Sequence, residues 1–270
     1  MVFNRDTLRQ FLNIVGFALM IVVNTLSQTL PINNQTNADI ANRYPIYFLP
    51  ANFTFSIWGI IYLGLLAFTV YQALPSQREN LLLRRIGYWF FLTCLLNSAW
   101  LFVYQYDLYT LSMLPMLMLL GSLIAIHLRL NIGKVRVSAC HHWLVHVPFS
   151  IYLGWISVAT IANAAYVLYV DAAWRDPASG QIATFVMLAI GALLAGLMLF
   201  VRNTPAFAFV VIWAFMGIYA RHSAAPTFTT ALPADFMTLA ASVGTFAAVM
   251  SVGVGVIIIV WFFVKGRKFA

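Results

Sequence analysis

Eight apolar stretches, each long enough to cross a lipid bilayer, set the strongest limit on how this chain can fold. A helix needs about 20 apolar residues to cross the hydrocarbon core. Backbone N–H and C=O groups in lipid must bond within the chain, so spans with this pattern form helices. We predict an all-α, polytopic membrane protein with about eight transmembrane helices, at residues 10–30, 51–74, 86–105, 109–130, 147–170, 181–201, 205–221 and 236–264.

The composition supports this fold class and excludes one kind of partner. Hydrophobic residues make up 63% of the 270 residues and charged residues 8%, whereas about 25% of a soluble domain is charged. A net charge of +8 would suit nucleic acid only if the basic residues formed a water-facing patch. They are scattered between apolar stretches instead. We therefore expect a lipid bilayer as partner and no nucleic acid.

The basic residues predict the orientation, because Lys and Arg accumulate in cytoplasmic connections. Alternate connections hold only three basic residues, Arg43, Arg175 and Arg221. We therefore predict that both termini are cytoplasmic, in the plasma membrane or, in a bacterium, the inner membrane. The predicted inside segments contain Arg5, Arg9, Arg78, Arg84, Arg85, Arg129, Lys134, Arg136, Arg202, Lys265, Arg267 and Lys268.

Residues 31–50 form a polar connection rich in Asn and Pro, which this orientation places outside. A long ordered loop over a membrane bundle is often a lid. A solvated spacer is the alternative, and the sequence favours neither.

The positions of the acidic residues argue against proton pumping and against an enzyme. All of them fall in connections or at span ends: Asp6, Asp39, Glu79, Asp107, Asp171, Asp176 and Asp235. A proton-coupled pump usually needs a carboxylate within the membrane. General acid–base catalysis inside the bundle lacks the same group. We expect no catalytic residues, and we disfavour a porphyrin-degrading activity.

Cys140, His141, His142 and His146 gather in one predicted inside connection. His142 and His146 are spaced i, i+4, which could present two imidazoles to a metal or a haem on a helix. An amphipathic border at the lipid interface explains the same residues. We favour the border and predict no metal site.

Aromatic and amide side chains share faces of three predicted spans. Trp58 and Tyr62 lie one turn apart. The other two faces carry Asn97, Trp100 and Tyr104, and Tyr152, Trp155, Ala159, Asn163 and Tyr166. An Asn in lipid needs a partner, so these faces should point inward. All three reach the predicted outer half of the bilayer, below residues 31–50. They could form a ligand chamber, or they could only hold the helices together.

The same segments resemble the translocator protein family, also called tryptophan-rich sensory proteins or TspO/MBR. Residues 56–63, Ser-Ile-Trp-Gly-Ile-Ile-Tyr-Leu, resemble its Pro-Val-Trp-x-x-x-Tyr segment. Residues 96–100, Leu-Asn-Ser-Ala-Trp, resemble its Leu-Asn-x-x-Trp segment. Residues 155–163, from Trp155 to Asn163, resemble its Trp-Val-x-Phe-Ala-x-x-Leu-Asn helix. The resemblance covers residues 8–170, the first five spans.

In that family, five helices enclose a hydrophobic pocket beneath the loop between the first two helices. Its ligands are porphyrins, sterols and synthetic aromatic drugs. The resemblance implies 31–50 as the lid, and ligand-binding roles for Trp58, Tyr62, Asn97, Trp100, Trp155, Ala159 and Asn163. We add Tyr152, which shares their face.

Two departures from the family pattern concern the loop and the C-terminal region. Leu49-Pro50-Ala51-Asn52 stands where the family has Pro-Pro-x-Trp, so a loop Trp that could touch ligand is missing. The three spans after residue 180 have no counterpart in the five-helix core. We therefore predict a ligand-binding bundle at 1–175 and three further helices at 176–270. Val167, Tyr169 and Arg175 form a loose version of the family's sterol-contact pattern.

We predict an integral membrane receptor or sensor that binds a hydrophobic planar ligand, with tetrapyrroles as the leading candidates. The alternative is a transporter of a lipid-soluble small molecule, which would show flux in liposomes where a receptor shows none. No cofactor is required, although a porphyrin could be bound. A homodimer is an assembly that the sequence permits.

Overall fold

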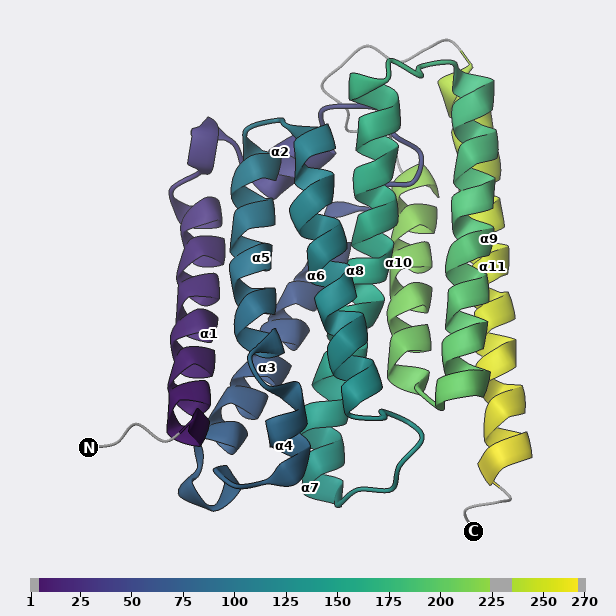
Figure 1. The fold of residues 1–270 in the computed structure, drawn as a ribbon. Coiled ribbons are helices and arrows are strands. Elements are labelled where there is room, and N and C mark those ends of the chain that lie inside the picture. The colour runs from purple at the N-terminus through teal and green to yellow at the C-terminus, as the bar shows by residue number, and fades with distance from the viewer. Residues whose placement is uncertain (1–4, 224–234, 267–270) are drawn as a thin grey trace. The chain divides into compact units, whose positions relative to one another are not determined.

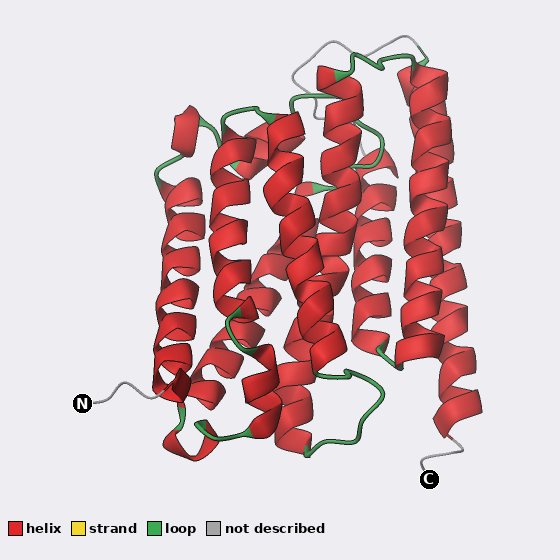
Figure 2. Cartoon of the chain, viewed as in Figure 1, coloured by secondary structure: helices red, strands yellow, loops and turns green. Residues whose placement is uncertain are grey.

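The computed structural model describes residues 5–223 and 235–266, and within these ranges the chain is helical without any strand (Figures 1 and 2). The long helices are α1 (Arg5–Thr29), α3 (Ile57–Ala73), α5 (Trp89–Gln105), α6 (Tyr109–Arg129), α8 (Val147–Tyr166), α9 (Pro177–Arg202), α10 (Pro205–Ser223) and α11 (Phe236–Gly266). The short helices are η1 (Ile32–Asn34), α2 (Asn37–Ala41), η2 (Asn52–Ser56), η3 (Pro75–Gln77), α4 (Leu81–Ile86), α7 (Ala139–His141), η4 (His142–His146) and η5 (Val167–Asp171).

Each predicted span corresponds to one long helix. Among the described residues, 7 helical stretches are long and apolar enough to cross a membrane, and α5 is a shorter apolar helix of 17 residues. The all-α, polytopic prediction is therefore confirmed. Helix α5 begins at Trp89 rather than at 86, because Gly87, with φ of +57°, ends α4 just before it. The fifth stretch begins at Ala139, earlier than predicted, because α7 and η4 continue directly into α8.

The chain divides into two compact units. Unit 1 comprises Met1–Thr36 and Ile57–Ile156, and unit 2 comprises Asn37–Ser56 and Ser157–Ala270. Helix α8 contributes to both. Most of the predicted loop 31–50 therefore belongs to unit 2, while its first residues belong to unit 1. The predicted functional division at residue 175 stays a prediction.

In unit 1, α5 packs against α1 and α6, and α1 also packs against α3. Three buried phenylalanines join α3, α5 and α8. The ring centroid of Phe68 lies 4.8 Å from that of Phe90 and 4.9 Å from that of Phe149, and both pairs meet edge to face. This geometry is favourable for aromatic rings and adds to the burial of apolar surface.

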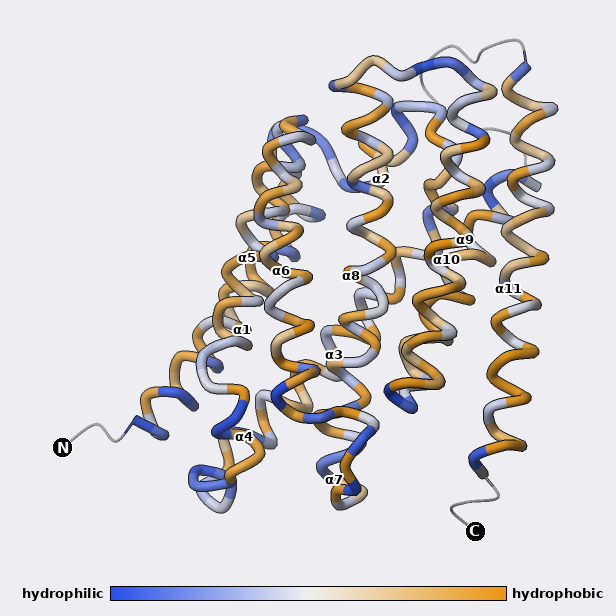
Figure 3. The backbone as a smooth tube through the Cα atoms, turned by 45° about the vertical axis from the view of Figure 1, so that its right-hand side comes forward, coloured by the Kyte–Doolittle hydropathy of each residue, from blue (hydrophilic) through white to orange (hydrophobic). Residues whose placement is uncertain are grey.

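In unit 2, the helices α9, α10 and α11 pack against one another, and η2 packs against α10. Gly191 on α9 faces Phe215 on α10, and a β-carbon there would lie 2.9 Å from the ring. The absence of a side chain thus lets the two helices approach closely. In Figure 3 the hydrophobic residues run along the long helices, while hydrophilic residues gather in connections and near helix ends.

Candidate ligand-binding site

Four predicted site residues form an aromatic cluster in unit 1, made of Trp58, Tyr62, Tyr152 and Trp155. The Trp58 ring stacks on Tyr62 with centroids 5.4 Å apart. It meets Tyr152 and Trp155 edge to face at 6.1 and 6.2 Å. Tyr152 and Trp155 are buried, and Trp58 and Tyr62 are half-buried. The predicted faces of α3 and α8 therefore do meet.

Two further predicted residues, Asn97 and Trp100, lie on α5 in the same unit. The buried Asn97 Oδ1 accepts a hydrogen bond of 2.8 Å from Asn24 Nδ2, which ties α5 to α1. Asn97 is also a polar neighbour of the buried Tyr152 hydroxyl. Trp100 stacks on Tyr104 with centroids 5.1 Å apart. Asn97 thus has at least a structural role in joining helices.

Replacing Asn97 with leucine is expected to lower the free energy of unfolding by about 1–2 kcal/mol, because it leaves the Asn24 amide without this partner. Thermal unfolding in detergent measures the change. Asn24→Leu should cost a similar amount, and the double variant should cost less than the sum of both. If the double variant lost the full sum of the two single losses, the two amides would not stabilise each other.

The last two predicted residues, Ala159 and Asn163, lie on the part of α8 that belongs to unit 2. Asn163 is buried and Ala159 is half-buried. Their spacing continues the face of Trp155 by one and two helical turns. Neither residue lines the pocket described next.

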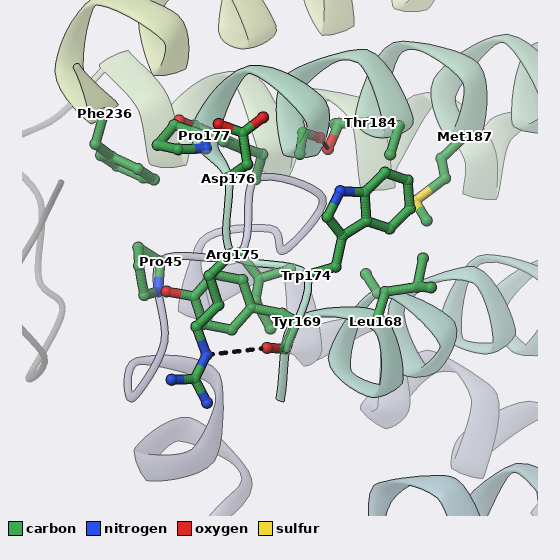
Figure 4. A pocket seen from close by; sticks show the side chains of 15 residues that line it. Pro45, Leu168, Tyr169, Trp174, Arg175, Asp176, Pro177, Thr184, Met187 and Phe236 are labelled. Atoms are coloured by element: carbon green, nitrogen blue, oxygen red, sulfur yellow. Dashed lines mark hydrogen bonds between the residues drawn. The ribbon is translucent and has the colours of Figure 1, made fainter. Parts of the chain in front are cut away.

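A pocket in unit 2 is formed where four segments meet: the connection before η2, the end of α8 with η5, the start of α9, and the start of α11 (Figure 4). None of the eight predicted site residues lines it. Its empty space is about 500 Å³, with the part open to the surface included. The lining residues are Pro45, Ile46, Tyr47, Ala165, Leu168, Tyr169, Trp174, Arg175, Asp176, Pro177, Gly180, Ala183, Thr184, Met187 and Phe236.

Four aromatic side chains line this pocket: Tyr47, Tyr169, Trp174 and Phe236. Tyr47 and Phe236 stack almost parallel, with centroids 4.7 Å apart, and both are buried. Trp174 is 43% exposed, so its indole is open to a ligand, and Figure 4 shows it beside Met187. Flat apolar molecules bind well to walls of this kind, because rings stack on the faces of Trp and Tyr.

The polar groups of the pocket are few and mostly bonded. Arg175 Nε donates to the Tyr169 carbonyl at 3.3 Å. Asp176 caps α9, and hydrogen bonds from the Ser179 hydroxyl and backbone N–H hold the pKa of its carboxyl below the ordinary value. Burial raises the pKa of Tyr47 to about 12, so it stays a neutral phenol. Its buried hydroxyl has no hydrogen-bond partner among the described residues.

The connection that carries Tyr47 is attached to α10. The buried Arg221 donates through Nη2 to the Ala41 carbonyl at 2.9 Å and through Nη1 to Asn42 Oδ1 at 3.1 Å. The neighbouring His222 Nε2 lies 2.8 Å from the Tyr47 carbonyl oxygen. Residues 46–49 are buried. This part of the loop is therefore a packed wall of the pocket and not a solvated spacer.

The predicted histidine group lies in unit 1 beside Tyr71. The His141 ring centroid is 5.1 Å from that of His146, and the two rings meet edge to face. Both side chains are buried, whereas His142 and Cys140 are exposed. Within the described part of the chain, three or more metal-ligating groups do not come together.

Two residues of the pocket, Tyr169 and Arg175, also belong to the loose sterol-contact pattern of the sequence. The sequence carried no ligand-binding prediction for Trp174. Met187 and Phe236 lie in helices without a functional prediction. The Asp176-Pro177 pair could have indicated the position of Trp174 from the sequence. This pair is typical of a helix start, so it places Trp174 in the turn just before α9.

Comparison with protein families gives a match over most of the chain. A family model described as TSPO-like protein covers residues 10–265. The match therefore extends beyond residues 8–170 and includes α9, α10 and most of α11. No curated protein and no solved structure matches the chain.

Proposed function

This chain belongs to the TSPO-like family of membrane proteins, and on that basis we propose that it is a receptor or sensor for a hydrophobic planar ligand. The pocket in unit 2 carries the proposal, because aromatic side chains line it and the residues 45–47 form one wall. A tetrapyrrole is the leading candidate. The exposed Trp174 offers an indole face on which the rings of a tetrapyrrole could stack.

The predicted orientation supports access from the outer surface. The loop 31–50, the end of α8, the start of α9 and the start of α11 all lie at the predicted outer face. A ligand that partitions into the outer leaflet would therefore meet the pocket directly. Once bound, its polar edge could accept a hydrogen bond from the Tyr47 hydroxyl, which fixes the orientation of an otherwise apolar ligand.

The aromatic cluster of unit 1 is the second candidate position for the same ligand. The family resemblance implies it through Trp58, Tyr62 and Trp155. Its rings already contact one another, so a ligand must separate them to enter. The open indole of Trp174 makes the pocket in unit 2 the preferred position.

Trp174→Ala is expected to weaken protoporphyrin binding roughly tenfold, because the stacking surface is lost. Titration of the purified protein, followed by protoporphyrin absorbance, measures the dissociation constant. Trp143→Ala, which removes another exposed tryptophan, is the matched control and should bind as the wild type does.

Trp155→Ala distinguishes the two positions in the same titration. A loss of affinity in Trp155→Ala but not in Trp174→Ala would place the ligand at the aromatic cluster. Equal, non-saturating signals in all variants would mean that protoporphyrin only partitions into detergent. That result would contradict tetrapyrrole binding.

A further inference from the structure

A second surface with the features of a binding site lies in unit 1, where α1 begins and where the connection from α3 to α5 runs. We call it the basic face and define it by the exposed residues Arg5, Arg78, Arg84 and Arg85 with the buried Arg9 behind them. The start of α1 and the connection from α3 to α5 contain two carboxylates, Asp6 and Glu79. Positive charge is therefore in excess.

Asp6 is already bound by arginines. Arg84 holds both carboxylate oxygens, with Nε 3.0 Å from Oδ1 and Nη2 2.6 Å from Oδ2. Arg9 Nη2 lies 3.7 Å from Oδ1. Such a bidentate pair fixes the carboxylate and leaves it little capacity to neutralise further cations. Asp6 also interacts electrostatically with Arg78. With only Asp6 and Glu79 against five arginines, the basic face still keeps a net positive charge that attracts an external anion.

Arg9 adds a charge that is not fully compensated. Its side chain is buried, and Nη2 donates to the Arg78 carbonyl at 2.9 Å. Nε and Nη1 are buried without a hydrogen-bond partner among the described residues. A buried guanidinium acts through a medium of low dielectric constant, so it raises the potential at the surface above it.

The short helix α4 gives the basic face an interfacial character. Leu83 and Ile86 are buried within unit 1, whereas the side chain of Leu81 on the same helix is 70% exposed. Arg84 and Arg85 stand on the same helix. Exposed leucine next to arginine is typical of segments at the boundary between acyl chains and headgroups, because the apolar group enters the lipid and the guanidinium stays at the headgroup level.

We propose that the basic face binds the phosphate headgroup of an anionic phospholipid, with Arg78 and Arg85 as the residues that contact it. The exposed Leu81, and Leu74 at 44% exposure, favour a lipid over free phosphate, because they offer apolar surface for acyl chains. The predicted orientation places this face at the cytoplasmic leaflet, where anionic lipids are abundant. The proposal is independent of the ligand in the unit 2 pocket.

The test compares two lipids on the full-length protein in detergent. Phosphatidylglycerol should raise the melting temperature more than phosphatidylcholine of the same chain length. The double variant Arg78→Gln/Arg85→Gln leaves the Arg84–Asp6 pair intact. It should bind phosphatidylglycerol roughly 10- to 30-fold more weakly, since each arginine near an anionic surface contributes roughly a factor of five.

Two controls make the result specific. Arg78→Lys/Arg85→Lys keeps the charge and should keep most of the lipid preference. Arg43→Gln removes an arginine from unit 2, and this variant should keep the full preference for phosphatidylglycerol. The proposal is overturned if the wild type shows no preference between the lipids, or if the double Gln variant retains the preference. It is also overturned if inorganic phosphate stabilises the protein as phosphatidylglycerol does, because the site would then bind free anions.

Discussion

Replacing Gly217 with alanine is expected to lower the free energy of unfolding by about 1–3 kcal/mol, which is typical of overpacking at a tight contact. A β-carbon at this position of α10 would lie 2.8 Å from Thr54 Cγ2 and 2.9 Å from Pro50 Cβ, and it would also meet the Thr54 hydroxyl. The same contact carries a hydrogen bond of 3.0 Å from the Ala51 N–H to the Gly217 carbonyl. The connection before α3 must therefore move away from α10. Thermal unfolding in detergent measures the loss.

A control and a rescue variant separate this contact from a general effect of alanine. Gly253 on α11 has open space around it, so Gly253→Ala should be neutral or slightly stabilising. Thr54→Ala in the Gly217→Ala background removes Cγ2 and the hydroxyl, and it should restore part of the stability. A Gly217→Ala protein that unfolds at the wild-type temperature would show that this contact is not tight.

Replacing Arg221 with methionine should have an even larger effect, a loss of about 2–4 kcal/mol. The guanidinium donates to Ala41, Asn42 and Pro50, the last at 3.4 Å. Hydrogen bonds from a charged donor are strong, and the buried carbonyls would be left without it. Methionine preserves the apolar length of the side chain, so the loss reports the hydrogen bonds. Unfolding temperature gives the stability, and limited proteolysis shows whether residues 37–56 become accessible.

The matched control for Arg221 is an arginine outside this contact. Arg43→Met removes an arginine from the same connection and should change stability much less. Arg221→Lys keeps the charge but lacks the planar fork, so we expect an intermediate loss. If Arg221→Met resists protease and heat as the wild type does, Arg221 does not hold the connection on α10.

The spans and the aromatic cluster could be predicted because each depends on a local pattern. Lipid requires long apolar helices, and the chain contains eight such stretches. Trp58 and Tyr62 on α3, like Tyr152 and Trp155 on α8, share helix faces by spacing alone. The prediction that these faces meet needed only one further argument, that aromatic and amide faces point inward.

The pocket could not be predicted, because its residues come from segments far apart in the chain. Tyr47 and Phe236 stack although 189 positions separate them by their numbering, and neither shows a distinctive motif. Arg221 ends an apolar stretch, where a basic residue usually faces water or headgroups. Only the packing of the connection 37–56 against α10 shows that this arginine is buried and bonded.

The contacts of Arg221 also bear on how the protein is made. Its partners Ala41 and Pro50 precede it by 180 and 171 positions, and chains are synthesised from the N-terminus at about 5–20 residues per second. Residues 37–56 therefore reach the membrane surface many seconds before α10 leaves the ribosome. During that interval the connection has none of its α10 contacts, so the unit 2 pocket is completed only when the last helices are inserted.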